Sequence, residues 1–333
     1  MPQRFDFSII SEKALASTAE MQSFLTKYDT DAPTRQRVEG LAQKFASRFD
    51  AINVNQPKID GKSTNPFVLS AFARTQSISM VSELDQLIAA AKMFSSLETA
   101  LGRVVEDVVP SSYGWSQVHS ESHSLLSEID SAKVQRSSST VFLAALKSGP
   151  SCINDSMVSQ IANAIATHWE QWADNWKVNN VHYIVGMNYS TGKNSNKKDW
   201  HIVRLAAEKL SEKGLAFSEP CIRQINVKGK LKLQAQNRFK ASTDQKNITV
   251  EVLQGRNFWA AIGDGNSDTF FEVCAALALA LSALNPSPLP DAPITVGLDK
   301  VISHANSLRS EKFETGAIQW FTLFVRHFVD AIH

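Results

Sequence analysis

Residues 128–150 of the chain read EIDSAKVQRSSSTVFLAALKSGP. Thr140 to Leu146 is a short apolar run rich in residues that favour β-strands, and Lys147 follows it directly. Asp130 lies near the end of a preceding extended segment, and residues 131–139 form a polar connector between the two. We therefore expect Asp130 and Lys147 to meet at one edge of a β-sheet.

The sequence that follows predicts a helix and further strands. Residues 155–176 have the apolar spacing of a helix, and Val181 to Tyr189 is a second apolar run rich in β-formers. Ile222 to Leu233 alternates apolar and basic residues, as a strand with one buried and one wet face does, and Asn247 to Leu253 predicts another strand. These elements predict an α/β (α+β) fold with a mixed central sheet flanked by helices.

Helical patterns dominate both ends of the chain. Pro110 ends the last of the N-terminal helices, and a proline-rich break at 285–293 precedes the C-terminal one. The predicted helices outside the strand region span 11–26, 31–51, 66–73, 79–94, 96–109, 255–284 and 299–330. We expect three regions, namely a helical N-terminal region at 1–64, a core at 65–285 and a C-terminal helical segment at 286–333.

Composition excludes several classes of protein. The hydrophobic fraction of 43% and the charged fraction of 20% are those of a chain that buries a sizeable core. The longest apolar stretch, Cys274 to Leu284, is too short to span a membrane and predicts a buried helix. The first residues carry a charge inside their apolar stretch and have no small-residue cleavage site, so we expect a cytoplasmic protein.

The three cysteines, Cys152, Cys221 and Cys274, are far apart and lack the spacing of zinc ligands. We expect reduced thiols and neither a disulfide framework nor a zinc site.

The formal net charge of +1 hides an uneven distribution. Residues 186–240 contain 12 Lys or Arg and four acidic residues, a balance of 12 − 4 = +8. This stretch predicts a surface that faces a polyanion. The alternative is a solvated charged face that acids elsewhere in the fold compensate.

Asp130 and Lys147 together suit the hydrolysis of a phosphodiester. A metal ion held by carboxylates polarises the scissile phosphate and lowers the pKa of an attacking water. A lysine beside it stabilises the negative charge that develops. We therefore expect Mg²⁺ as the cofactor.

At these motifs the chain resembles the PD-(D/E)xK nuclease superfamily, and specifically its type II restriction endonucleases. The resemblance rests on SLLSEIDSAKV at 124–134, VFLAALKSGPSCIND at 141–155, Gln160 and VHYIVGMNYSTGK at 181–193. It extends to NPFVLSAFA at 65–73, LGRVVEDVVP at 101–110 and GRNFW at 255–259. The chain looks most like enzymes that cut interrupted palindromes with outer GG and CC steps.

The resemblance gives Asp130 the role of the metal-binding aspartate and Lys147 that of the lysine. Ala145 departs from the pattern, which has an acidic residue two positions before the lysine. A second acid must then come from elsewhere, and Glu106 on the preceding helix is preferred over Glu128 on the strand of Asp130. The expected catalytic residues are Asp130, Lys147, Glu106 and Glu128, and the expected metal ligands are Asp130, Glu106 and Leu146.

DNA contacts are expected from the turn after Lys147, from the following helix and from the polar loop 189–198, because lysine and asparagine side chains contact base edges and phosphates. Each residue has a plainer alternative, such as a helix cap for Asn154 and a surface loop for 189–198. The predicted contacts are Ser148, Asn154, Gln160, Lys193, Asn194, Asn196, Lys197 and Lys198.

The resemblance implies a homodimer that cuts double-stranded DNA at a short palindromic site, one strand per subunit. The N-terminal helices would supply dimer contacts and embrace the duplex, and a cognate DNA methyltransferase would act on the same site without stable binding. Three alternatives remain, namely a structure-specific or repair nuclease, a DNA-binding protein that has lost catalysis at Ala145, and a helical scaffold.

Overall fold

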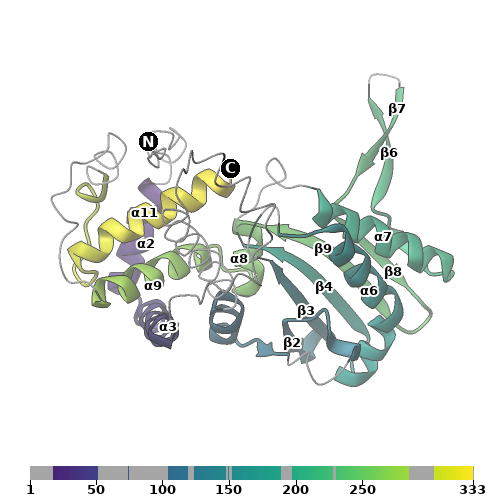
Figure 1. Cartoon of the computed structure of the whole chain (residues 1–333), viewed down its shortest axis with the longest axis horizontal. Coiled ribbons are helices and arrows are strands. Elements are labelled where there is room, and N and C mark those ends of the chain that lie inside the picture. The colour runs from purple at the N-terminus through teal and green to yellow at the C-terminus, as the bar shows by residue number, and fades with distance from the viewer. Residues whose placement is uncertain are drawn as a thin grey trace.

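A computed structural model describes residues 18–51, 74, 104–118, 124–147, 149, 152–188, 197–227, 230–284 and 304–332. It holds a seven-stranded sheet with helices against it and a cluster of helices at one end (Figure 1). The predicted α/β class, with a mixed sheet, flanking helices and a helical N-terminal part, is confirmed.

The sheet has the strand order β1-β2-β3-β4-β9-β8-β5. The central strands β3, β4 and β9 are parallel, and the outer strands pair antiparallel. The three parallel strands therefore present their carboxyl ends at one edge. The strands are β1 (Ser116–Gln117), β2 (Ser131–Gln135), β3 (Thr140–Lys147), β4 (Asn180–Met187), β5 (Ala216–Glu219), β8 (Arg238–Ser242) and β9 (Asn247–Gln254).

Helices α6 (Asp155–Trp176) and α7 (Lys198–Glu212) cover one face of this sheet (Figure 1). Successive strand residues point to opposite faces, so every second residue of β3 faces these helices. Leu143 and Ala145 of β3 are buried in the same cluster as Trp172 of α6. Strand β3 is nearly all apolar because both of its faces are covered.

The opposite face of β3 belongs to a second core. Ala144 and Leu146 are buried there with Phe258, which lies on α8 (Arg256–Ile262). This core continues into a cluster of four helices: α2 (Thr18–Thr30), α3 (Ala32–Ala51), α9 (Thr269–Leu284) and α11 (Thr315–Ile332). Packed rings, such as Phe24 against Phe271 with centroids 5.8 Å apart, hold the cluster together.

A buried carboxylate joins three parts of the helical cluster. Glu272 on α9 is fully buried and accepts two hydrogen bonds from Arg37 on α3, at 2.7 and 3.3 Å. The Tyr113 hydroxyl donates to the same carboxylate at 2.6 Å, and Asn266 donates at 3.3 Å. Burial and the adjacent carboxylate raise the pKa of Tyr113 well above its usual value, so the hydroxyl remains a donor.

The predicted helix over 255–284 is wrong in one respect, because it is two helices, α8 and α9. Asp264 and Gly265 have φ values of 58° and 86°, which no α-helix contains. A Cβ atom at Gly263 would overlap Thr269, so the chain passes too close there for any side chain. The turn carries Asp264 to Lys133 on β2, 2.6 Å away.

The single strand predicted at 222–233 is also wrong. This segment is a hairpin of β6 (Ile222–Val227) and β7 (Lys230–Ala235), which form a sheet of their own and project from the body (Figure 1). The polar connector predicted at 131–139 contains strand β2, which pairs antiparallel with β3. The alternation at 222–233 indicates extended structure but not its division into two strands, and the polar composition of 131–139 does not indicate β2, which pairs with β3.

The bounds of the other predicted helices and strands agree with the structure in some cases and differ in others. The helix at 155–176 and the strands near 140–146, 181–189 and 247–253 are confirmed within one or two residues. The helix ending at 109 continues past Pro110, since 104–112 are helical, and α11 begins only at Thr315, later than expected from 299–330. The helix predicted at 11–26 is found at 18–30 as α2. The helices predicted at 66–73 and 79–94 lie outside the described residues.

The three cysteines are free thiols, as expected. In the described part of the chain, no helix is long and apolar enough to cross a membrane.

We expect Glu272→Ala to lower the free energy of unfolding by about 3 kcal/mol, because it leaves the Arg37 guanidinium and the buried Tyr113 hydroxyl without their acceptor. Urea unfolding would measure this. The matched control is Glu208→Ala, which removes an exposed ion pair to Arg204 and should cost less than about 0.5 kcal/mol. Equal losses in the two variants would contradict the role of Glu272.

Candidate active site at the carboxyl edge of the sheet

The topology gathers chemical groups at the carboxyl edge of the parallel strands. Lys147 is the last residue of β3, and Asn188 directly follows β4. Helix α6 follows β3 and α7 follows β4, so both helices begin at this edge. The amino end of a helix carries a partial positive charge and free N–H groups, which favour an anion. The edge therefore suits a phosphate-bearing substrate.

Asp130 is held against β3 by its main chain and its side chain. Its N–H donates to the Ala144 carbonyl at 2.9 Å, and its carboxylate accepts from the Leu146 N–H at 2.6 Å. The Lys147 ammonium lies 3.9 Å from the same carboxylate oxygen. Both side chains keep partial contact with solvent, with 34% of Asp130 and 20% of Lys147 exposed. The structure thus brings together the two residues that the sequence predicts to meet.

Glu128 lies on a turn ahead of β2, and the expectation that it shares an extended strand with Asp130 is wrong. The turn nevertheless keeps Glu128 beside the pair. Burial raises the pKa of the Glu128 carboxyl, the Lys147 ammonium lowers it and the Asp130 carboxylate raises it. Glu128 is thus electrostatically coupled to both Asp130 and Lys147.

The two faces of β3 help to decide which acid could replace the one that Ala145 lacks. Ala145 and Lys147 are two residues apart and project to the same face, which α6 and α7 cover. Glu106 is half-buried on the helical segment 104–112, whose Val104 and Val108 pack into the core on the other side of β3.

The donor set at this edge fits a magnesium ion. Among the described residues, no group of three or more His, Cys, Asp or Glu side chains could hold a metal. Mg²⁺ does not require such a group, since it keeps several waters and binds through one or two carboxylates. Leu146 has a buried apolar side chain and could offer only its main-chain carbonyl oxygen.

The predicted DNA contacts fall into two groups. Asn154 caps α6 through a 2.9 Å bond from the Met157 N–H, so the capping alternative is confirmed, and Gln160 is exposed on the same helix. Lys197 precedes α7 in a left-handed conformation, and Lys198 forms an ion pair with Asp155 at the start of α6. Ser148, Lys193, Asn194 and Asn196 lie outside the described residues.

Two buried aromatic residues that the sequence did not single out for the site donate hydrogen bonds to the main chain near Glu128. The Tyr183 hydroxyl, on β4, donates to the main-chain carbonyl of Glu128. The indole N–H of Trp172, on α6, donates to the Leu125 carbonyl at 2.8 Å. Spacing marks both residues as core, and only the fold shows that their polar atoms reach the acidic turn.

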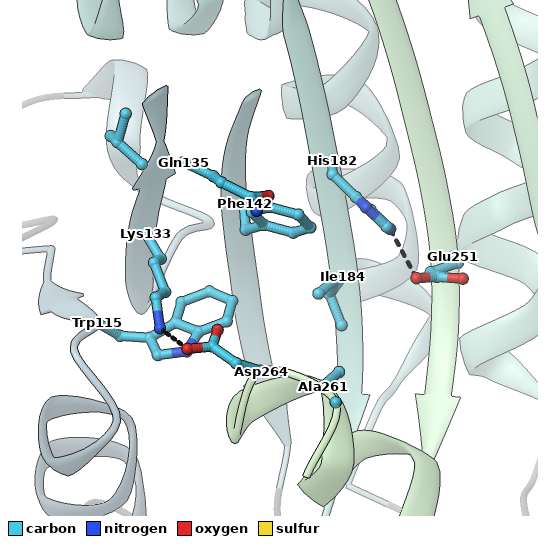
Figure 2. A pocket seen from close by; sticks show the side chains of 11 residues that line it. Trp115, Lys133, Gln135, Phe142, His182, Ile184, Glu251, Ala261 and Asp264 are labelled. Carbon is cyan, nitrogen blue, oxygen red and sulfur yellow. Dashed lines mark hydrogen bonds and ion pairs between the residues drawn. The ribbon is translucent and has the colours of Figure 1, made fainter. Parts of the chain in front are cut away.

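A separate cavity of about 520 Å³ opens on the other face of the sheet (Figure 2). Its polar side chains form internal pairs: His182 with Glu251 at 2.6 Å, and Lys133 with Asp264 at 2.6 Å. The histidine lowers the pKa of the Glu251 carboxyl against the opposing effect of burial. These side chains already pair with one another, and the described residues lining the cavity do not include Asp130 or Lys147.

Comparison with known proteins agrees with an edge that suits a phosphate-bearing substrate. The family model described as type II restriction endonuclease EcoO109I matches residues 35–213, which is more than half of the chain. The match identifies a type II restriction endonuclease, a class of DNA-hydrolysing enzymes that typically use a divalent metal. Within that class, the chain belongs to the EcoO109I family. No curated protein sequence matches the chain.

We expect the pKa of Glu128 to move in opposite directions in two variants. Lys147→Met removes the cation that favours the carboxylate and should raise this pKa, whereas Asp130→Asn removes a repelling charge and should lower it. Carboxyl ¹³C NMR titration with a metal chelator present would measure both shifts. Lys133→Met, which disrupts an ion pair on the other face, is the control. Shifts of the same sign in the first two variants would contradict the described geometry.

Proposed function

We propose that this protein is a Mg²⁺-dependent restriction endonuclease whose active site consists of Asp130, Glu128 and Lys147. The observation that carries the proposal is the meeting of Asp130 and Lys147 at the sheet edge, 3.9 Å apart. Glu128 precedes Asp130 by two residues, and the charges of Lys147 and Asp130 both act on its carboxyl. The family supplies the reaction, the hydrolysis of DNA. The geometry of Asp130 and Lys147 supports this choice of residues.

In this proposal each residue has one task. The Asp130 and Glu128 carboxylates, with the Leu146 carbonyl, hold the metal, which when bound polarises the scissile phosphate and acidifies an attacking water. The hydrogen bond from the Leu146 N–H fixes one oxygen of Asp130 and leaves the other free to act as a ligand. The Lys147 ammonium stabilises the negative charge that develops on the phosphate.

The choice of Glu128 over Glu106 rests on the two faces of β3. Lys147 belongs to the face that α6 covers, and Glu128 is coupled to it. The helical segment of Glu106 packs on the opposite side. A carboxylate projecting from position 145 would also lie on the lysine face. Glu128 is therefore our preferred replacement for the acid that Ala145 lacks.

We further propose that DNA lies along this edge and contacts the projecting hairpin. The starts of α6 and α7 face the edge, and α7 carries Lys197 and Lys198 there. The sequence of β6 and β7 is rich in basic residues, and a two-stranded ribbon fits the major groove. The loop 189–196, Asn154 and Gln160 remain proposed contacts.

The substrate in this proposal is a short palindrome with outer GG and CC steps. A palindrome presents two equivalent half-sites, which a twofold-symmetric homodimer matches, so that each subunit cuts one strand. A cognate methyltransferase would protect the same site. A smear, or nicking at junctions, upon digestion of a defined plasmid would instead favour a structure-specific nuclease of the same fold.

One observation favours a second candidate function, a DNA-binding protein with impaired catalysis. Ala145 is 1% exposed and surrounded by apolar side chains, so the lysine-bearing strand offers no acid on that face before Lys147. If Glu128 does not replace it, a single carboxylate would hold Mg²⁺ weakly.

Asp130→Ala and Lys147→Ala should each reduce the rate of plasmid cleavage by about a hundredfold or more and largely spare DNA binding, because they remove a metal ligand and a charge that stabilises the transition state. Digestion into discrete bands and gel-shift binding would measure the two properties. Lys133→Ala, whose partner Asp264 lies in the separate cavity, should cut normally. Full activity in either site variant would overturn the proposed site.

Glu128→Gln and Glu106→Gln decide between the two acids. We expect Glu128→Gln to lose cleavage and Glu106→Gln to retain it, with single-turnover rates at fixed Mg²⁺ as the measurement. The reverse result would assign the second carboxylate to Glu106. In the Glu128→Gln background, Ala145→Glu should restore part of the rate if the two positions serve the same metal.

A further inference from the structure

The turn that carries the two acids is fixed from inside the core by a pair of stacked rings. Tyr183 and Trp172 are fully buried, and their rings stack with centroids 5.6 Å apart and planes 15° apart. Each ring donates a hydrogen bond to a main-chain carbonyl of this segment: the Tyr183 hydroxyl to Glu128 and the Trp172 indole N–H to Leu125.

These two hydrogen bonds reach residues 125 and 128, which precede the first residue of β2 that pairs with β3. Strand pairing with β3 begins at Ser131, and Asp130 is held by its own bonds to β3. Glu128 lies ahead of these bonds, on the turn. The Tyr183 hydroxyl thus reaches the main chain of the residue that would supply the second carboxylate.

The chemistry of the two rings makes this support rigid. A buried tyrosine hydroxyl that loses its acceptor is strongly unfavourable, so the bond to Glu128 is maintained. Tyr183 stays protonated because burial and the carboxylates of Asp130 and Glu128 raise its pKa well above the usual value. Aromatic rings have few rotatable bonds, and stacking restricts them further.

We propose that Tyr183, backed by Trp172, is a positioning residue that sets the place of the Glu128 carboxylate relative to Asp130 and so governs metal affinity. The inference rests on the proposed function of Glu128 and Asp130 as metal ligands. Partners that orient metal ligands typically change metal affinity by about 10- to 100-fold when they are removed.

The test is Tyr183→Phe in the full-length protein, which removes one hydroxyl and keeps the ring. We expect the affinity for Ca²⁺, measured by calorimetry in the presence of plasmid DNA, to fall about tenfold. The Mg²⁺ concentration needed for half-maximal cleavage should rise by a similar factor, and high Mg²⁺ should restore the rate. Restoration by metal is a result that a general loss of stability would not give.

Tyr28→Phe is the matched control. Tyr28 is also buried, and its hydroxyl donates to Glu39 at 3.1 Å in the helical cluster, away from the site. It should lower the melting temperature as Tyr183→Phe does and leave the metal dependence unchanged. If Tyr183→Phe fails to fold, Trp172→Phe takes its place, since it removes the N–H that reaches Leu125, together with part of the indole ring, and should shift metal affinity in the same direction.

One outcome would overturn the positioning role of Tyr183, and a different one would overturn the proposed metal site. Unchanged metal affinity and Mg²⁺ dependence in Tyr183→Phe, together with weakened binding in Asp130→Ala and Glu128→Gln, would overturn the positioning role alone. Metal binding that is the same in wild type, Asp130→Ala and Glu128→Gln would overturn the proposed metal site itself.

Discussion

The parallel pairing of β3 with β4 is the constraint on which the site depends. It runs in continuous register from Thr140 opposite Asn180 to Lys147 opposite Met187. Parallel strands need a crossover connection, which α6 provides, so the lysine-bearing strand end and the start of α6 must share one edge. A shift of one residue would turn Lys147 to the other face and bury it among the side chains now packed around Leu146.

Several basic side chains of the fold form local ion pairs. In the basic stretch 186–240, Arg204 pairs with Glu208, and Arg238 and Lys240 both pair with Glu219. These side chains are compensated locally, as the alternative of a solvated charged face expects. Strands β6 and β7, whose sequence is rich in basic residues, form a two-stranded sheet of their own. The local balance of the hairpin, and not the net charge of the chain, is what would meet a phosphate backbone.

The elements that could be predicted from the sequence are those whose apolar residues indicate burial. Strands β3, β4 and β9 and helix α6 have apolar patterns that match two covered faces, and Asp130 and Lys147 follow from their places beside β3. Strand β2 and the division of the predicted 222–233 strand into β6 and β7 escaped prediction, because the pairing between strands defines both. The coupling of Glu128 to Lys147 escaped too, since it depends on a turn whose place is fixed by Tyr183, 55 residues further on.

Ala145 is more easily understood from burial than from chemistry. The position is 1% exposed among apolar side chains, where an ionised carboxylate would be costly unless a metal or a cation stayed beside it. Glu128, on the turn ahead of β2, is only partly buried, and the Lys147 ammonium opposes the effect of that burial on its pKa. If Glu128 supplies the second carboxylate, as proposed, the metal-free protein avoids a buried charge at position 145. In that arrangement the position of the carboxylate depends on the groups that hold the turn, which include the Tyr183 hydroxyl and the Trp172 indole.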